Sequence, residues 1–252
     1  MSNFKHIFSL YYPTLSIFYE SLAINGATVL DDKALCSRIV SVLRLKKGNR
    51  LILFDRFVYA CVELQEVDKK KCIAQLIEKK ENTIVGPNVT VLLPLLKKDD
   101  LEKAIYDVTA VGVANVQLMI TEKVQRIWGE QKEYDRLIKI MIAAAEQSKC
   151  YTFARLQKPM CFFNFFSTAL IKDSTNIFAD PIGQSFFDTM ENLKNKQPKE
   201  IILFIGPEGD ITAQEKEYLK EHRFIFCKLT PTVLRARQAI GLLAGAVRSI
   251  MY

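Results

Sequence analysis

An apolar run that leads into a glycine-containing turn constrains the fold of this chain more than any other feature. Residues 201–205 read Ile-Ile-Leu-Phe-Ile, and residues 206–209 read Gly-Pro-Glu-Gly. A strand buried on both faces loses the polar alternation of a surface strand, so the run predicts a parallel strand inside an α/β sheet. Thr212 and Glu215 have the spacing of a capping box, which predicts a helix over 212–221.

The turn itself indicates a binding loop. Gly206 and Gly209 place two of the chain's 10 glycines within four positions. Glycine permits a positive φ angle or a close approach between backbone and ligand, and Pro207 fixes one torsion between the two glycines. The alternative is an ordinary turn between a strand and a helix.

A second strand and loop follow in the same order. Residues 224–229 predict a strand, and a loop over 231–235 comes after it. Residues 239–251 are apolar nearly all round, which predicts a helix that is buried or packs against a partner. Gly241 and Gly245 lie four residues apart on one face, so we expect this helix to pack closely on a neighbouring backbone.

Strands alternate with helices through the second half of the chain, which implies a parallel α/β sheet. Asp99 and Glu102 predict a capped helix over 99–111. The polar stretch 78–88 contains Gly86-Pro87 and indicates a linker before that half. The other predicted strands are 51–54, 59–64, 89–96, 116–120 and 176–179, and the other predicted helix is 134–149.

Five motifs, spread in order along the chain, resemble those of one known family. The chain is similar on these motifs to the SPOUT superfamily of methyltransferases, and within it to the enzymes that methylate N3 of a uridine in bacterial small-subunit ribosomal RNA. The motifs are Val42-Leu43-Arg44-Leu45-Lys46-Lys47-Gly48-Asn49, the helix over 97–113, Ala145-Glu146-Gln147-Ser148, Gly206-Pro207-Glu208-Gly209-Asp210, and Leu234-Arg235-Ala236-Arg237-Gln238-Ala239.

The resemblance implies a fold of two domains and a cofactor. Residues 1–78 would form a PUA-like β-barrel that binds RNA. Residues 79–252 would form a SPOUT α/β domain with a parallel sheet and a deep trefoil knot at its C-terminal end. S-adenosylmethionine would supply the methyl group. The resemblance carries these residues onto the cofactor site: Phe178, Ala179, Gly206, Pro207, Glu208, Gly209, Leu229, Leu234 and Ala236.

Arg235 is the catalytic candidate by the same resemblance. N3 of uridine must lose its proton before or during methyl transfer, and a guanidinium beside the base would stabilise the developing anion. The resemblance also implies a homodimer, and ribosomal RNA or the small ribosomal subunit as partner.

The chain departs from the family pattern at several positions. Arg237-Gln238 stands where the family usually carries Glu-Thr, which reverses a charge beside the expected cofactor pocket. Asp210 replaces the last glycine of the first loop. Cys150 and Ala110 replace an arginine and a glutamate. These departures affect the expected substrate contacts and activity more than the expected fold.

Positive charge gathers in the first third of the chain. The net charge is +7, and residues 1–85 carry 13 Lys and Arg against 9 Asp and Glu. Basic loops around short strands suit phosphate contact, although charge alone favours a solvated surface. With the family resemblance, we predict RNA contacts at Arg38, Arg44, Lys46, Arg50, Arg56 and Arg237.

Several other kinds of site and location are not expected. The six cysteines form no C-x-x-C pair and the chain has two histidines, so we expect no metal site and reduced thiols. Neither the dinucleotide nor the P-loop glycine pattern is present. The apolar stretch 161–171 is too short and too polar to span a membrane, and residues 1–10 lack a secretion signal. We therefore expect a cytoplasmic protein.

Two other functions stay open at this stage. The chain could be a divergent homologue that binds RNA or ribosomal particles without catalysis, an alternative prompted by Arg237-Gln238. It could also be a SPOUT methyltransferase that acts on another RNA nucleotide. Cofactor binding separates the first alternative from an active enzyme, and mapping of the methylated nucleotide separates the second.

Overall fold

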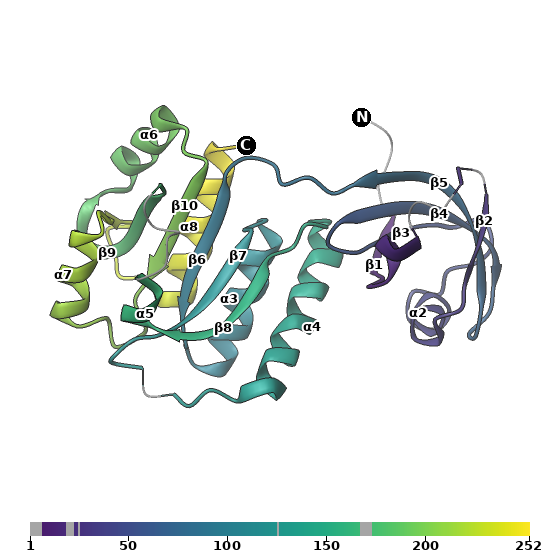
Figure 1. Cartoon of the computed structure of the whole chain (residues 1–252), viewed down its shortest axis with the longest axis horizontal. Helices are drawn as coiled ribbons and strands as arrows, with labels where there is room; N and C mark the ends of the chain where they lie inside the picture. Colours follow the sequence, from purple (N-terminus) through teal and green to yellow (C-terminus); the bar gives the residue numbers. More distant parts are fainter. Residues whose placement is uncertain (1–6, 19–22, 25, 125, 167–172) are drawn as a thin grey trace. The chain divides into compact units, whose positions relative to one another are not determined.

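Two separate β-sheets organise the chain (Figure 1). The computed structural model describes residues 7–18, 23–24, 26–124, 126–166 and 173–252, so the stretches 1–10 and 161–171 lie partly outside the described residues. The first compact unit comprises residues 1–83 and 145–152, and the second comprises residues 84–144 and 153–252.

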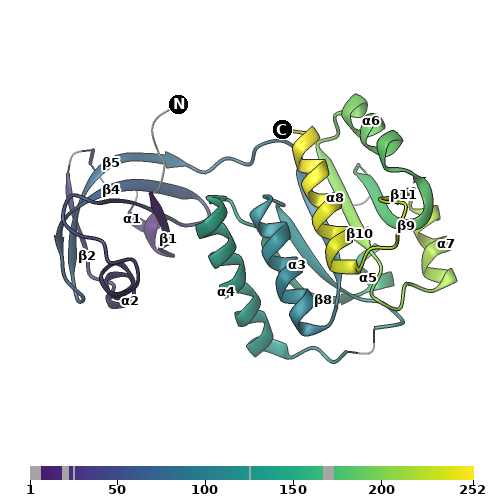
Figure 2. The same ribbon diagram turned by 180° about the vertical axis from the view of Figure 1, so that it is seen from behind.

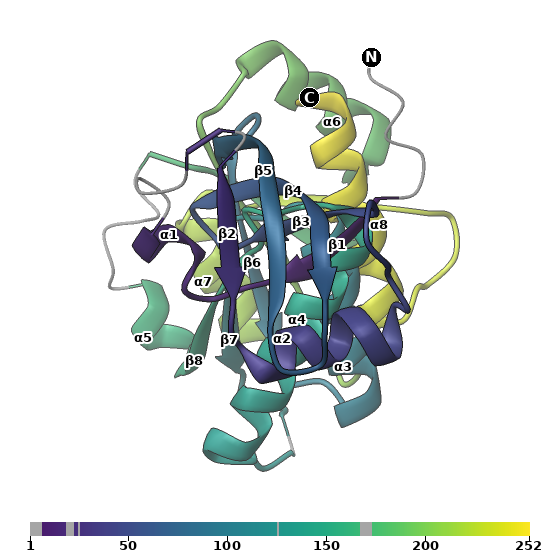
Figure 3. The same ribbon diagram turned by 90° about the vertical axis from the view of Figure 1, so that its right-hand side faces the viewer.

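The first unit contains a five-stranded sheet (Figure 3). Its strand order is β1-β3-β4-β5-β2, in which β1 runs parallel to β3 and the other pairs are antiparallel. The elements are β1 (Phe8–Tyr11), α1 (Leu15–Phe18), β2 (Ala27–Leu30), α2 (Lys33–Ser37), the π-helical turn η1 (Arg38–Val42), β3 (Arg50–Phe54), β4 (Val58–Val67) and β5 (Cys72–Glu81).

The second unit contains a six-stranded sheet in which every pairing is parallel, as the alternation of strands and helices predicts. The strand order is β11-β9-β10-β6-β7-β8. The strands are β6 (Asn88–Pro94), β7 (Asn115–Ile120), β8 (Arg155–Cys161), β9 (Thr175–Ser185), β10 (Glu200–Ile205) and β11 (Ile225–Lys228).

Helices cover both faces of this sheet. The helices are α3 (Lys98–Ala110), α4 (Glu130–Ser148), α5 (Phe162–Phe166), α6 (Phe186–Lys196), α7 (Ala213–Glu221) and α8 (Ala236–Ile250). α3 and α8 lie side by side on one face (Figure 2), and α5 and α7 lie on the other (Figure 1). Ile202 and Phe204 of β10 join the aromatic cluster beneath α5 and α7, so the alternate residues of that strand face α8.

The boundaries differ from those predicted where backbone pairing extends an element. β5 continues to Glu81 because it pairs with β4, so residues 78–81 are strand and not linker. β9 runs on to Ser185 because it pairs with β11. Gly183 permits this pairing, since a Cβ atom there would lie 2.3 Å from the backbone carbon of Phe226. α4 and α8 also begin earlier than predicted, by four and three residues.

Two predictions about the helices are wrong. The N-cap of α3 is Lys97 and has no side-chain hydrogen bond, because Asp99 lies inside the first turn. Gly241 and Gly245 do not approach a neighbouring backbone: the nearest atom to a Cβ at Gly241 is a side-chain atom of Asp107 at 3.8 Å, and Gly245 has open space. Within the part of the chain that is described, no helix is long and apolar enough to cross a membrane.

The aromatic cluster gives a test of the packing. Phe204 is fully buried, with its ring centroid 5.3 Å from that of Phe178 and 5.9 Å from that of Phe162. Phe204→Ala should lower the free energy of unfolding of the second unit by about 3–5 kcal/mol, because it leaves a cavity in the core. The control is Phe187→Ala, whose side chain is 72% exposed, with an expected change below about 0.5 kcal/mol. Urea denaturation measures both, and equal losses would contradict this packing.

Candidate functional site

One cavity of about 360 Å³ in the second unit is lined by the two loops that the sequence predicts. The first loop follows β10 and contributes residues 206–208 and Asp210. The second follows β11 and contributes residues 233–236, and β9 adds Ala179 and Pro181. Parallel strands place their carboxyl ends at one edge of the sheet, which is where ligands bind in open α/β folds.

A smaller cavity of about 70 Å³ shares part of this wall. Ala179, Pro181, Val233, Leu234 and Ala239 line both cavities. The smaller one adds Asp180 of β9, Cys227 of β11, and Leu229 and two threonines from the loop after β11. Burial raises the pKa of the Cys227 thiol, partly offset by a hydrogen bond with Thr189, so this cysteine is a poor nucleophile.

The structure brings together most of the residues predicted for the cofactor site. Phe178 does not line either cavity, because its side chain points into the core and packs on Phe204 and Phe226. Gly209 is also outside the lining. The predicted residues that line the larger cavity are Ala179, Gly206, Pro207, Glu208, Leu234, Arg235 and Ala236, and Leu229 lines the smaller one.

Several lining residues were not among those predicted. Pro181 comes from the continuation of β9 beyond the predicted strand, and Ile205 is the last residue of β10. Position in the sequence is the available signal, because Ile205 ends one predicted strand and Pro181 comes two positions after another, 176–179. The full set that was missed in the larger cavity is Pro181, Ile205, Asp210, Val233 and Ala239.

The glycines of the first loop do not adopt the positive φ angle that glycine permits. Neither Gly206 nor Gly209 has a positive φ angle, whereas Asp210 has φ 60°. Asp is one of the few non-glycine residues that tolerate this left-handed conformation. A Cβ atom at Gly206 would lie 3.1 Å from Oδ1 of Asp210, so the first glycine makes room for that carboxylate.

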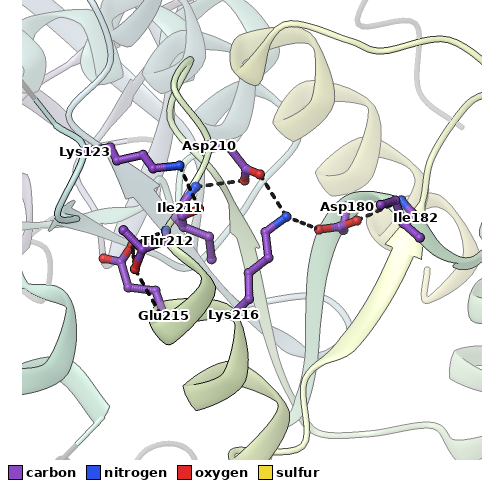
Figure 4. A network of polar contacts seen from close by, with 8 residues as sticks. All are labelled: Lys123, Asp180, Ile182, Asp210, Ile211, Thr212, Glu215 and Lys216. Atoms are coloured by element: carbon purple, nitrogen blue, oxygen red, sulfur yellow. Dashed lines mark hydrogen bonds and ion pairs between the residues drawn. The ribbon is translucent and has the colours of Figure 1, made fainter.

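Lys216 ties the first loop to the middle of β9 (Figure 4). Its ammonium lies 2.8 Å from Oδ2 of Asp210 and 2.8 Å from Oδ2 of Asp180. The other oxygen of each carboxylate accepts a backbone N–H bond of 2.8 Å, from Ile211 and Ile182 respectively. Burial lowers the pKa of Lys216, but the bonds to the two carboxylates outweigh burial and raise the pKa above its ordinary value.

The predicted capping box is confirmed and holds the loop from its other side. Glu215 Oε2 accepts the Thr212 N–H at 2.8 Å, and the Thr212 hydroxyl accepts the Glu215 N–H at 3.2 Å. The Glu215 side chain is buried and also accepts the Glu122 N–H at 3.0 Å. Lys123 donates to the Ile211 carbonyl at 3.3 Å (Figure 4). Loop 206–211 is therefore bonded on both sides.

Arg237 and Gln238, the two residues at the start of α8 that depart from the family pattern, both make polar contacts in the structure. The N–H of Arg235 donates to Oε1 of Gln238 at 3.2 Å, so Gln238 satisfies a backbone donor at the helix N-terminus. The Arg237 guanidinium faces two carboxylates of α3, 3.7 Å from Asp100 and 3.6 Å from Asp107. The positive charge at residue 237 is therefore matched by acids on the neighbouring helix.

The basic residues predicted for the N-terminal part lie in the first unit. Arg38 makes a bidentate bond with Glu146 at 2.7 and 2.9 Å, and Arg50 bonds Glu63 at 3.1 Å. Arg44 and Lys46 are exposed. Arg56 is half-buried. Their contact with RNA stays a prediction, and the two paired arginines have part of their charge compensated.

The described residues contain no group of three or more His, Cys, Asp or Glu side chains that could hold a metal ion. All six cysteines are free thiols.

A family model described as an RNA methyltransferase domain matches residues 85–248. This range contains both cavities and all of their lining residues.

Relatives and solved structures agree in length with the chain. It is 29% identical to "Ribosomal RNA small subunit methyltransferase E" of Bacillus subtilis over 80% of this chain and 82% of the relative. A crystal structure of the protein of that name from Neisseria gonorrhoeae, bound to S-adenosyl methionine, has a TM-score of 0.79 at 22% identity and covers 97% of this chain and 98% of its own. A Legionella pneumophila protein with the same cofactor has a TM-score of 0.80 at 21% identity, with the same coverage. These structures share the fold of this chain.

Lys216→Met should destabilise the second unit by about 1–3 kcal/mol, because it removes two charged hydrogen bonds. The raised pKa means that folding favours the charged amine. The stabilisation should therefore be complete below the ordinary pKa of 10.5 and disappear as the pH rises through the folded value. Urea unfolding of both proteins between pH 7 and about pH 11 measures this. Lys220→Met is the control, since the ion pair of Lys220 among the described residues is with the exposed Glu217, and its loss should cost below about 1 kcal/mol. A difference that grows above pH 10.5 would contradict the assignment.

Proposed function

The chain belongs to the RNA methyltransferase family whose domain its residues 85–248 match, and from this membership we propose that the protein transfers the methyl group of S-adenosylmethionine to N3 of a uridine in small-subunit ribosomal RNA. The cavity between the two strand-end loops is the observation that carries the proposal. The names of the curated relatives support ribosomal RNA of the small subunit as the substrate.

The cavity fits such a cofactor in size and chemistry. A volume of about 360 Å³ is in the usual range of small-molecule sites, roughly 300–1,000 Å³. Ala179, Ile205 and Leu234 offer apolar surface for an adenine ring, and the two loops offer backbone donors and acceptors. Two carboxylates, Glu208 and Asp210, are on the wall and favour a ligand that carries positive charge.

S-adenosylmethionine supplies an electrophilic methyl group on a sulfonium. The protein's own task is to hold N3 of the base in line with that methyl while the proton of N3 leaves. Arg235 is on the cavity wall, and we assign its guanidinium to stabilise the negative charge that develops on the uridine. Gln238 holds the backbone of Arg235, and Lys97 donates a 3.4 Å backbone bond to Glu208, so both loops are anchored by neighbours.

The remaining expectations belong to the same proposal. We assign the first unit, with its mixed five-stranded sheet, as a PUA-like RNA-binding module whose contacts include Arg44 and Lys46. We further propose that the second unit is a SPOUT domain with a deep trefoil knot, and that two chains form a homodimer. Ribosomal RNA as substrate supports a cytoplasmic location.

Cofactor binding is tested with two variants, each at the first residue of a helix. Ala236 is the first residue of α8 and lines the cavity, whereas Ala213 is the first residue of α7, is exposed and is outside the lining. Ala236→Tyr should fill the cavity and weaken S-adenosylmethionine binding at least about tenfold, which is about 1.4 kcal/mol. Ala213→Tyr should leave the affinity unchanged. Calorimetric titration of folded variants measures both, and equal affinities would place the cofactor elsewhere.

Catalysis is tested at Arg235. Arg235→Gln should reduce methyl transfer about a hundredfold while cofactor affinity stays within about threefold, because it removes charge stabilisation from the transition state. Arg223→Gln removes an exposed arginine outside the cavity and is the control. The assay is mass spectrometry of nucleosides from small subunits of a strain that lacks the gene. Binding of the cofactor without methylation by the parent protein would favour a non-catalytic homologue, and methylation of another nucleotide would show a different target.

A further inference from the structure

A third and larger cavity, of about 610 Å³, lies between the N-terminal parts of α3 and α4. We call it the α3–α4 groove. Lys98 lines it from α3, and Lys132, Arg136 and Lys139 line it from α4. The three residues of α4 are spaced by four and three positions, so they lie on one face of that helix. None of them is among the basic residues that the sequence pattern singled out.

The charges in the groove leave a surplus of lysines. Glu102 of α3 holds Arg136 with bonds of 3.0 and 3.3 Å. Arg136, and to a smaller extent Lys98, lower the pKa of Glu102, so that carboxylate is ionised and its pair with Arg136 is maintained. Glu133 accepts hydrogen bonds from Arg126 and from the backbone of Gly129.

Three cations of the groove are left over from these pairs. Among the described residues, no ion pair with a carboxylate forms at Lys98, Lys132 or Lys139. Among the described residues that line the groove, the other carboxylate besides Glu133 is Asp135. It accepts a hydrogen bond of 2.7 Å from the Gln131 side chain. The groove therefore favours an anionic ligand that can contact several lysines at once.

The wall also offers apolar surface. Ile127 lines the groove and its side chain is 90% exposed. The chain's single tryptophan, Trp128, stands between Ile127 and Gly129, both of which line the groove. Lysines beside exposed apolar surface suit a ligand that combines phosphates with unpaired bases, as single-stranded RNA does.

The groove adjoins the proposed cofactor cavity across the first turn of α3. Lys97 donates its backbone N–H to Glu208, which lines the cofactor cavity, and the next residue, Lys98, lines the groove. Both cavities lie in the second unit and within residues 85–248. An RNA strand in the groove would therefore pass beside the cavity where the reaction is proposed.

We propose that the α3–α4 groove binds the phosphate backbone of single-stranded RNA beside the nucleotide to be methylated, with Lys98, Lys132 and Lys139 as the phosphate contacts. This inference rests on the proposed function for its choice of RNA over an acidic protein. Its binding test does not require turnover.

The test compares two triple variants of equal charge. Lys98→Gln, Lys132→Gln and Lys139→Gln together remove the groove lysines. Lys194→Gln, Lys196→Gln and Lys199→Gln together remove three exposed lysines of the same unit that line neither cavity. The probe is a fluorescein-labelled, single-stranded oligouridylate, titrated by anisotropy at several salt concentrations. Calorimetry with S-adenosylmethionine and circular dichroism check that each variant keeps its cofactor affinity and its fold.

The groove variant should weaken RNA binding and reduce the slope of log affinity against log salt by about 2, since each single-strand phosphate contact contributes about 0.7. The control variant should retain the parent slope. Bound RNA should also shield Trp128 from iodide quenching in the parent. Equal slopes in the two variants, unchanged quenching, or displacement of the RNA by polyglutamate at matched charge would overturn the proposal.

The two proposals fail in distinguishable ways. If the parent protein does not bind S-adenosylmethionine but the groove lysines still govern RNA affinity, the proposed methyl transfer fails and the groove stands. If the cofactor binds and methylation proceeds while the groove variant binds and methylates RNA like the parent, the groove fails and the proposed function stands.

Discussion

The parallel register of β9, β10 and β6 is the constraint on which the rest of the site depends. β10 lies between the other two and pairs Ile205 with Ala179 and Phe204 with Leu92. Because β11 also runs parallel to β9, the loops that follow β10 and β11 meet at the same edge of the sheet.

Two residues that depart from the family pattern, Asp210 and Arg237, lie beside side chains of opposite charge. Asp210 stands at a position where the family carries glycine, and it has a positive φ angle. Its carboxylate pairs with the Lys216 ammonium and accepts a hydrogen bond from the Ile211 N–H. Arg237 lies beside Asp100 and Asp107 of α3. A reversed charge on one helix is thus matched by opposite charges on its neighbour. These exchanges keep the two loops in place, so the departures do not by themselves argue against a working cofactor site.

The first turn of α3 is the junction of the second unit's binding surfaces. Lys97 bonds the first loop through Glu208, Asp100 faces the start of α8 through Arg237, and Lys98 lines the α3–α4 groove. The unpaired N–H groups of a helix N-terminus and its positive dipole favour anions, and the carboxylate of Glu208 uses one of these donors. One short segment therefore contacts both loops and the basic groove.

The sequence by itself determined the elements whose signals are local. The apolar run of β10, the capping box of Thr212 and Glu215, and the alternation of strands with helices follow from neighbours in the chain, so they could be predicted together with the parallel α/β sheet. Tertiary structure alone decided the strand order, the inward direction of Phe178, and the pairing of Arg237 with α3. These depend on contacts between different segments of the chain, 26 positions apart for Phe178 and Phe204 and 137 positions apart for Asp100 and Arg237. Composition or spacing within one segment carries no information about which other segment will lie beside it.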